Sequence, residues 1–170
     1  MSWVQSSGES NIARNRRSVL IRSARKSDVP SFLALVDALA DYEKLRRPTR
    51  NARSRLIRDG FGRRRRIDPI LALVDGQAVG YAIVFETYSS FLALPTLYLE
   101  DLFVLPEYRG KRIGLHLFQH CVDEAKRRGC GRMEWMVLSW NKLAIRFYDR
   151  YGAKRMNTWL PYRIEIRKKG

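Results

Sequence analysis

The sequence has few of the residues that cross-link small domains or bind metals. Two cysteines, Cys121 and Cys130, and two histidines, His116 and His120, occur in 170 residues. The cysteines flank an expected helix end, which is a poor basis for a disulfide framework or a metal site. The histidines have ligand spacing, but no glutamate follows His116 and no third ligand is evident. We therefore predict reduced, structural thiols and no bound metal.

Long apolar runs are missing as well. No stretch approaches the roughly 20 apolar residues that a membrane-spanning helix needs. The start of the chain has no cationic flank followed by an apolar run, so no secretory signal is predicted. We expect a cytoplasmic protein without a membrane partner. With 45% hydrophobic and 29% charged residues, the chain fits one globular domain.

Negative charge is scarce. The chain has 33 lysines and arginines against 17 aspartates and glutamates, a formal net charge of +16. The excess is heaviest in four runs, Arg14–Arg17, Arg63–Arg66, Lys126–Arg128 and Arg167–Lys169. Such runs attract nucleic acid, acidic partners or a phosphate-rich cofactor, although each alone also fits ordinary solvated surface. No nucleic-acid-binding fold motif is evident, so a nucleic-acid partner is not favoured.

Periodicity and turn residues predict alternating strands and helices. Residues 1–17 are expected to form a flexible basic N-terminal arm, and residues 18–170 a single domain. The expected strands cover residues 19–21, 70–74, 78–85, 97–104, 133–138, 153–158 and 162–166, with a hairpin at Asp75-Gly76 and a loop over 87–95. The expected helices run from an N-cap at Ser27 to about Leu45, around Leu56 and Ile57, over 111–128 and over 142–151.

The segment from Leu97 to Gly114 carries the clearest chemical signal, because it is a strand followed by a glycine-containing turn and a helix start. The first turn of a helix has unpaired N–H groups and the positive end of the helix dipole, so a pyrophosphate can bind there. Gly110 and Gly114 permit close approach of the backbone. Basic side chains that can add hydrogen bonds are Arg109, Lys111 and Arg112. An ordinary strand-to-helix turn has the same local pattern.

In this context the sequence resembles the GNAT acetyltransferases, whose signature is Gln/Arg-x-x-Gly-x-Gly/Ala. Arg109, Ile113 and Gly114 fit, while Arg112 replaces the middle glycine of the family. The substitution leaves the backbone geometry at this position open, and a residue with an ordinary negative φ could still donate its N–H. We also expect its guanidinium to point at the phosphates of coenzyme A.

Within GNAT the chain is most similar to diamine acetyltransferases of the spermidine/spermine and thialysine type. The matching stretches are Ile21-Arg22, residues 40–43, 59–62, 98–101 and 108–110, Trp140-Asn141, Phe147-Tyr148 and Gly152-Ala153. The resemblance implies an α/β (α+β) GNAT fold, with a mixed, mostly antiparallel sheet of about six to seven strands and about four flanking helices. It also implies a homodimer.

The same resemblance implies acetyl-CoA (coenzyme A) as cofactor. The strand backbone near Phe103 would bind the pantetheine arm and the acetyl carbonyl, and a splay after this strand would free its N–H groups. The implied cofactor-binding residues are Leu102, Phe103, Val104, Arg109, Gly110, Lys111, Arg112, Ile113, Gly114, Leu115, Asn141, Lys142, Leu143, Ala144 and Tyr148.

Acetyl transfer needs a neutral amine and a proton for the departing thiolate. A lysine-like amine has a pKa of about 10.4, so a base must remove its proton. The family position of Glu100 suggests this base, acting directly or through water, and Tyr148 matches the tyrosine near the sulfur and is the expected general acid. Direct transfer in a ternary complex should suffice. Strand alternation would put Leu99, Asp101 and Phe103 on one face and Tyr98, Glu100 and Leu102 on the other.

The acceptor side is predicted to be acidic. The residues that the resemblance assigns to the amine are Tyr42, Glu43, Glu100, Asp101, Glu134, Trp135 and Met136. The net charge repels a polyamine at long range, but nearby carboxylates dominate within a Debye length of about 8 Å. The loop over 87–94 also lacks the acid that polyamine enzymes carry. We therefore favour a small primary amine, either a diamine or polyamine or a lysine-like amine, over spermidine by name.

Two other interpretations stay open. The chain could acetylate protein lysines or N-termini, with the basic surface docking an acidic or nucleic-acid-bound partner. It could also be a nucleic-acid-associated binding module that keeps a GNAT fold. An extended groove would favour the first, and salt-sensitive binding to nucleic acid would favour the second.

Overall fold

The computed structural model describes residues 18–166, so the arm predicted for residues 1–17 and the basic run Arg167–Lys169 lie outside it. The chain divides into two compact units, one ending at Trp135 and one beginning at Met136, and each is described by itself. None of the helices in residues 18–166 is long and apolar enough to cross a membrane.

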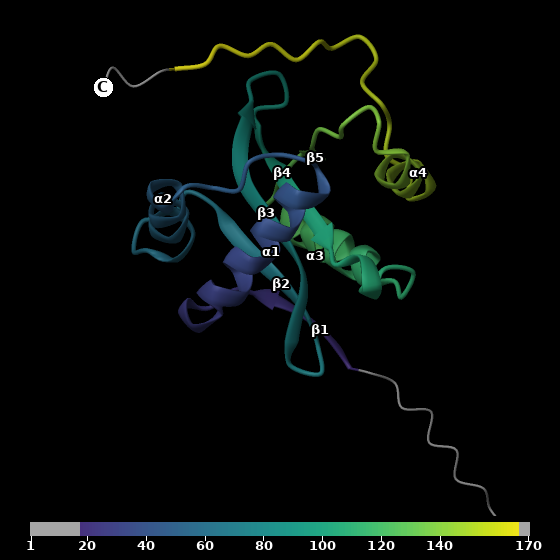
Figure 1. Ribbon diagram of the computed structural model, residues 1–170. Helices are drawn as coiled ribbons and strands as arrows, with labels where there is room; N and C mark the ends of the chain where they lie inside the picture. Colours follow the sequence, from purple (N-terminus) through teal and green to yellow (C-terminus); the bar gives the residue numbers. More distant parts are fainter. Residues whose placement is uncertain (1–17, 167–170) are drawn as a thin grey trace, which may run out of the picture. The chain divides into compact units, whose positions relative to one another are not determined.

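A single five-stranded sheet forms the centre of the first unit (Figure 1). The strands follow the order β1 (Val19–Ser23), β2 (Asp68–Val74), β3 (Gln77–Ser89), β4 (Leu94–Val104) and β5 (Arg132–Glu134). The first four are antiparallel neighbours, while β5 pairs with β4 in parallel. The predicted mixed, mostly antiparallel sheet is confirmed, with five strands in place of six or seven.

The predicted hairpin at Asp75-Gly76 joins β2 and β3. Both residues are left-handed, with φ of 50° and 82°, as a two-residue hairpin turn requires. The loop predicted over 87–95 is wrong, because Thr87 and Tyr88 pair with Thr96 and Pro95. β-branched and aromatic residues favour a paired strand, which extends this second hairpin almost to its tip.

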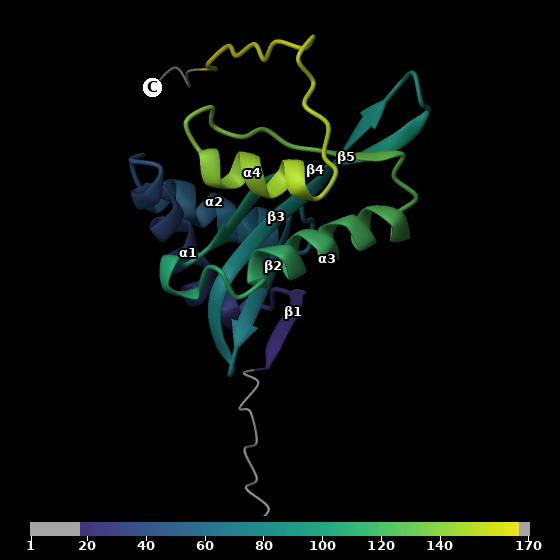
Figure 2. The same ribbon diagram turned by 90° about the vertical axis from the view of Figure 1, so that its right-hand side faces the viewer.

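Helices cover both faces of the sheet, with α1 (Val29–Tyr42) on one face and α3 (Ile113–Arg127) on the other (Figures 1 and 2). On the α1 side, Phe32 packs edge-on against Tyr81, with ring centroids 5.5 Å apart, and against Phe61 at the end of α2 (Arg50–Phe61). On the other side, α3 buries Ile113, Leu117, Phe118, Cys121 and Ala125. The helical spacing of the sequence predicts one apolar stripe of Ile113, Leu117, Cys121, Val122 and Ala125, and all of these are buried except Val122, which is half-buried.

Two helix boundaries differ from the expectation. The N-cap of α1 is Asp28, not Ser27, because the chain first makes a short 3-10 turn over Lys26–Asp28. The Asp28 carboxylate accepts hydrogen bonds from the Arg22 side chain at 2.6 and 3.0 Å and from the backbone N–H of Arg25 at 2.7 Å. α1 ends at Tyr42, and Lys44 at φ 57° turns the chain away before Leu45.

The second unit contains α4 (Lys142–Arg150), whose first turn is capped by Asn141 accepting a hydrogen bond from the N–H of Ala144 at 3.1 Å. The strand predicted over residues 133–138 is shorter than expected: the observed strand is β5, which ends at Glu134. No strand occurs between residues 153 and 166, so the final strand pair is wrong. Tyr162, Ile164 and Ile166 alternate as in a strand but are 87 to 91% exposed. Without a neighbouring strand, the pattern gains no ladder hydrogen bonds.

Candidate functional site

A β-bulge in β4 lies at the predicted base. Ile83 is opposite Asp101 and the next residue, Val84, is opposite Leu99, so Glu100 is the extra residue. Leu99 therefore lies on the same face as Leu102, and the alternation predicted from sequence is wrong before the bulge. The bulge leaves Glu100 exposed at the point where the strand bends.

The charges of two neighbouring carboxylates act on Asp101 beside this bulge. Asp101 accepts a hydrogen bond from the Tyr81 hydroxyl at 3.0 Å. Burial raises the pKa of Asp101 to about 6, the Tyr81 hydrogen bond opposes that rise, and the charges of Glu100 and Glu43 add to it. Burial also raises the pKa of Glu43, at the end of α1. The structure thus brings together Glu43, Glu100 and Asp101, three of the predicted acceptor residues.

Arg109 connects this cluster to the turn that follows β4. Its guanidinium lies 4.5 Å from the centre of the Tyr42 ring and 5.5 Å from that of Phe103. Its Nε donates a hydrogen bond to the carbonyl of Val104 at 2.9 Å. The side chain of Arg109 therefore holds the end of α1 against the end of β4, a role that the sequence alone did not suggest.

One edge of β4 is available near this point. β5 pairs with Thr96, Leu97 and Tyr98 only, so within the described residues the rest of β4 pairs only with β3. The N–H of Leu105 donates to the carbonyl of Val79 at 2.9 Å. Because N–H groups alternate in direction along an antiparallel strand, those of Leu102 and Val104 point away from β3.

Gly80 was not singled out from the sequence, although a glycine inside a strand signals close backbone approach. It lies opposite Val104 on β3, and a Cβ at this position would come within 2.7 Å of the carbonyl oxygen of Phe103. No real Cβ tolerates that distance, so only glycine allows β3 to pack this closely against the end of β4.

The turn before α3 contains two left-handed residues, Gly110 at φ 76° and Arg112 at φ 62°. Arg112 thus has the left-handed conformation that glycine adopts most readily, and not the ordinary negative φ of other residues. Among residues 18–166, no side chain caps the first turn of α3. Lys111 lies over the Tyr108 ring and donates to the carbonyl of Glu107 at 3.1 Å. A Cβ on Gly114 would touch Val104 at an ordinary 3.8 Å, so alanine would also fit there.

The remaining predicted residues are distributed between the units. Glu134 pairs with Arg132 at 2.9 Å, and Trp135 packs edge-on against Phe118 at 5.5 Å. Burial and the charges of Glu100 and Glu134 raise the pKa of Tyr98. The second unit holds Met136, residues 141–144 and Tyr148, whose ring lies 5.2 Å from that of Phe147.

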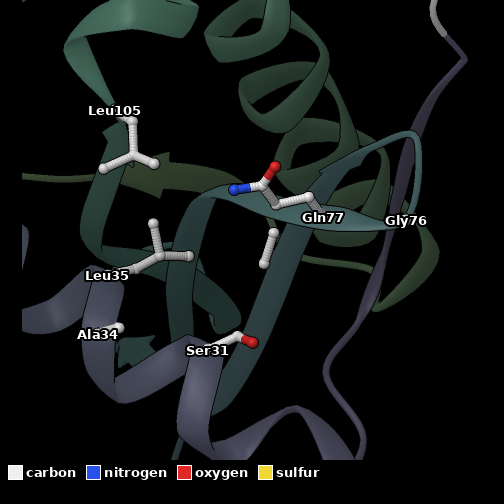
Figure 3. Close-up of a pocket in the computed structure, with 7 residues that line it drawn as sticks. Ser31, Ala34, Leu35, Gly76, Gln77 and Leu105 are labelled. Atoms are coloured by element: carbon white, nitrogen blue, oxygen red, sulfur yellow. The ribbon is translucent and has the colours of Figure 1, made fainter.

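A cavity of about 340 Å³ lies elsewhere in the first unit, between α1 and the turn that joins β2 to β3 (Figure 3). Its lining residues are Ser31, Ala34, Leu35, Gly76, Gln77, Ala78 and Leu105. None is a predicted site residue and none is titratable, so the cavity offers no base. Among residues 18–166, no group of three His, Cys, Asp or Glu side chains could hold a metal ion.

Known proteins resemble this chain in sequence and in fold. The sequence profile of the acetyltransferase (GNAT) family matches residues 32–153. A thialysine N-epsilon-acetyltransferase of Mus musculus is 32% identical over 159 residues, 87% of this chain and 93% of that protein. A spermidine/spermine N(1)-acetyltransferase-like protein 1 of Homo sapiens is 32% identical over 78% of this chain and 20% of its own length. The crystal structure of a possible acetyltransferase from Clostridium difficile 630 superposes with a TM-score of 0.77 at 18% identity, covering 88% of this chain and 99% of that one.

Proposed function

Because the chain belongs to the GNAT acetyltransferase family, we propose that it transfers the acetyl group of acetyl-CoA to a primary amine of a small molecule. The observation that supports this proposal is the group of Glu43, Glu100 and Asp101 beside the available edge of β4. Carboxylates attract an ammonium group, and the strand edge offers N–H groups to a carbonyl.

The residues of the first unit fit a coenzyme A thioester. The start of α3 has no side-chain cap and follows a left-handed turn, which suits a pyrophosphate. The N–H groups of Leu102 and Val104 suit the amides of an extended arm, much as in strand addition. Acetyl-CoA would supply the activated acetyl group.

The chain's residues would then perform three tasks. We propose that Glu43, Asp101 and Tyr42 bind the ammonium form of the substrate. Glu100 takes the proton, directly or through one water, and so generates the neutral amine that attacks. The N–H groups of Leu102 and Val104 would donate to the acetyl oxygen, and the Tyr148 hydroxyl would donate a proton to the leaving thiolate. This direct transfer in a ternary complex involves no covalent acetyl-enzyme.

The burial of Cys121 supports direct transfer. Cys121 is fully buried, and its pKa is raised to about 12, mainly by burial. A thiol with such a pKa forms almost no thiolate near neutral pH, and the thiolate is the nucleophile. An acetyl-cysteine at this position is therefore not part of the mechanism.

We propose a diamine, a polyamine or a lysine-like amine as substrate, since the mouse relative is a thialysine N-epsilon-acetyltransferase. The homodimer and the cytoplasmic location stay predictions.

A thiol-release assay with matched variants tests the proposed roles. Tyr148→Phe should lower kcat by about 10²-fold or more, because it removes only the donated proton. Tyr151→Phe, in which the altered tyrosine directly follows the same helix, should leave kcat unchanged. Glu100→Gln should lower kcat/KM most strongly at low pH, where amine deprotonation is hardest. Equal rates for native protein and Tyr148→Phe would exclude Tyr148 as the acid.

A further inference from the structure

Arginine is concentrated in α2 and its flanking loops. Residues 46–66 contain ten arginines, no lysine and one acidic residue, Asp59. α2 lies at an edge of the first unit, and the loop after it leads back to the sheet (Figure 1). None of these arginines is among the residues proposed for acetyl transfer.

Three of the ten arginines are neutralised by acidic neighbours. Arg47 pairs with Asp41, Arg53 with Asp37 and Arg58 with Asp59. The other seven are exposed and form no ion pair within residues 18–166, although Asp59 attracts Arg55 and Arg66. These seven, which we call the arginine surface, are Arg46, Arg50, Arg55, Arg63, Arg64, Arg65 and Arg66.

Not every basic run of the chain lacks acidic partners. In Lys126–Arg128, the Arg128 side chain bonds to Glu124, Asp68 and Glu86 at 2.7 to 3.2 Å. Arg127 pairs with Glu124, and Lys126 lies 3.5 Å from Asp123. That run joins α3 to the sheet, whereas the arginine surface retains its charge for an external partner.

The composition of the arginine surface points to phosphate. Solubility needs only charge, which lysine supplies equally well. Arginine instead offers a planar fork of donors that matches two oxygens of one phosphate, and its weaker hydration makes the contact less costly. Seven such groups on one helix and its two flanking loops suit a series of phosphates.

The arginine surface lacks the exposed apolar and aromatic side chains that binding to a membrane or to single-stranded nucleic acid requires. The nearest exposed large hydrophobic residue is Leu45, and within residues 46–66 Leu56 packs against the core while Phe61 is buried. A membrane-surface helix needs an exposed apolar face, and single-stranded nucleic acid binds on exposed aromatic side chains. A duplex has its phosphates outside and its bases stacked inside, so charge alone suffices. We propose that the arginine surface binds the phosphate backbone of a nucleic-acid duplex, without sequence preference.

Fluorescence anisotropy of a labelled duplex with the full chain tests this proposal. If about five phosphates are contacted, affinity should fall about 500-fold between about 50 and 200 mM salt. Absence of salt-sensitive binding by the native chain would overturn the proposal.

Charge-matched variants distinguish binding by the arginine surface from attraction by the net positive charge of the whole protein. Replacing Arg63, Arg64, Arg65 and Arg66 together by Gln should weaken binding about tenfold or more and flatten its salt dependence. A control variant with Lys26→Gln, Lys126→Gln, Arg150→Gln and Lys154→Gln loses the same charge and should weaken binding far less. Equal weakening in the two variants would overturn the proposal. Arg46→Gln with Arg50→Gln and Arg55→Gln repeats the test should the first variant fail to fold, with circular dichroism as the folding check.

Competing ligands test whether the arginine surface prefers a duplex to other polyanions. A single strand of the same sequence, vesicles rich in phosphatidylserine and poly-glutamate should each bind more weakly than the duplex at equal salt. Tighter binding of any of the three would contradict the proposal. Acetyl transfer to a small amine is measured separately on the same variants, so failure of duplex binding and failure of the proposed function are distinguishable.

Discussion

The hydroxyl of Tyr81 donates a hydrogen bond to the Asp101 carboxylate at 3.0 Å. The two side chains project from neighbouring strands toward α1. The negative charges of Glu43, at the end of α1, and of Glu100, in β4, act on both side chains. A buried carboxylate with acidic neighbours is costly to ionise unless a donor compensates. Tyr81 therefore helps to keep Asp101 ionised at neutral pH, where an ammonium substrate needs it.

Asp101→Asn should change how stability depends on pH. The pKa of Asp101 in the folded chain, about 6, exceeds the unfolded value of about 3.9. The protonated carboxyl thus contributes stability that is fully present below about pH 4 and is lost as pH rises through about 6. Relative to the native chain, Asp101→Asn should gain up to about 3 kcal/mol between pH 4 and 7. Urea unfolding at several pH values measures this difference, and a constant difference would contradict the burial of Asp101.

Tyr81→Phe should raise the pKa of Asp101 further, because it removes the donor that favours the ionised form. The acidic limb of the pH profile of kcat/KM should move upward by about one unit. Tyr88→Phe, which alters an exposed tyrosine on the same strand, is the control and should leave the profile in place. An unmoved limb in Tyr81→Phe would show that Asp101 does not bind the substrate as an anion.

Arg109→Lys should destabilise the chain although it keeps the charge. Lysine has no planar guanidinium, so it cannot stack over Tyr42 and donate to the carbonyl of Val104 at the same time. We expect a loss of about 1 to 2 kcal/mol in the free energy of unfolding. Urea denaturation compares Arg109→Lys with Arg46→Lys, a change at an exposed position that should leave the free energy of unfolding almost unchanged. Equal stability of the two variants would contradict the conclusion that the Arg109 side chain holds the end of α1 against the end of β4.

Two substitutions at Arg112 separate its backbone from its side chain. Because Arg112 is left-handed, Arg112→Gly should be more stable than Arg112→Ala by about 1 kcal/mol. Both lack the guanidinium, so both should bind coenzyme A more weakly than the native chain, with a shallower salt dependence. Calorimetric titration at several salt concentrations measures this. Native affinity in both variants would show that the guanidinium does not contact the phosphates.

Local signals predicted much of the fold. Asp75-Gly76 specifies its own turn, and the stripe from Ile113 to Ala125 specifies which face of α3 is buried. The lack of strands in residues 153–166 could not be predicted in this way, because whether an alternating segment forms a strand depends on a partner elsewhere in the chain.

The candidate site was less accessible from sequence. The resemblance drew attention to Tyr42, Glu43 and Glu100, but a period of two cannot reveal the bulge at Glu100. The bond from Tyr81 to Asp101 was missed, although a tyrosine on a buried strand signals a hydroxyl that needs a partner. The clamp formed by Arg109 depends on where α1 ends, which is tertiary information.

The central claim is acetyl transfer to a small primary amine. Incubation of the full chain with acetyl-CoA and a panel of diamines, polyamines, lysine analogues and peptides, followed by mass spectrometry of the amines, tests it most directly. We predict an N-acetylated diamine, polyamine or lysine analogue, with free thiol released in equal amount and with a rate that falls sharply in Glu100→Gln. No acetylated amine from the whole panel, or acetylation of the peptides alone, would contradict the claim.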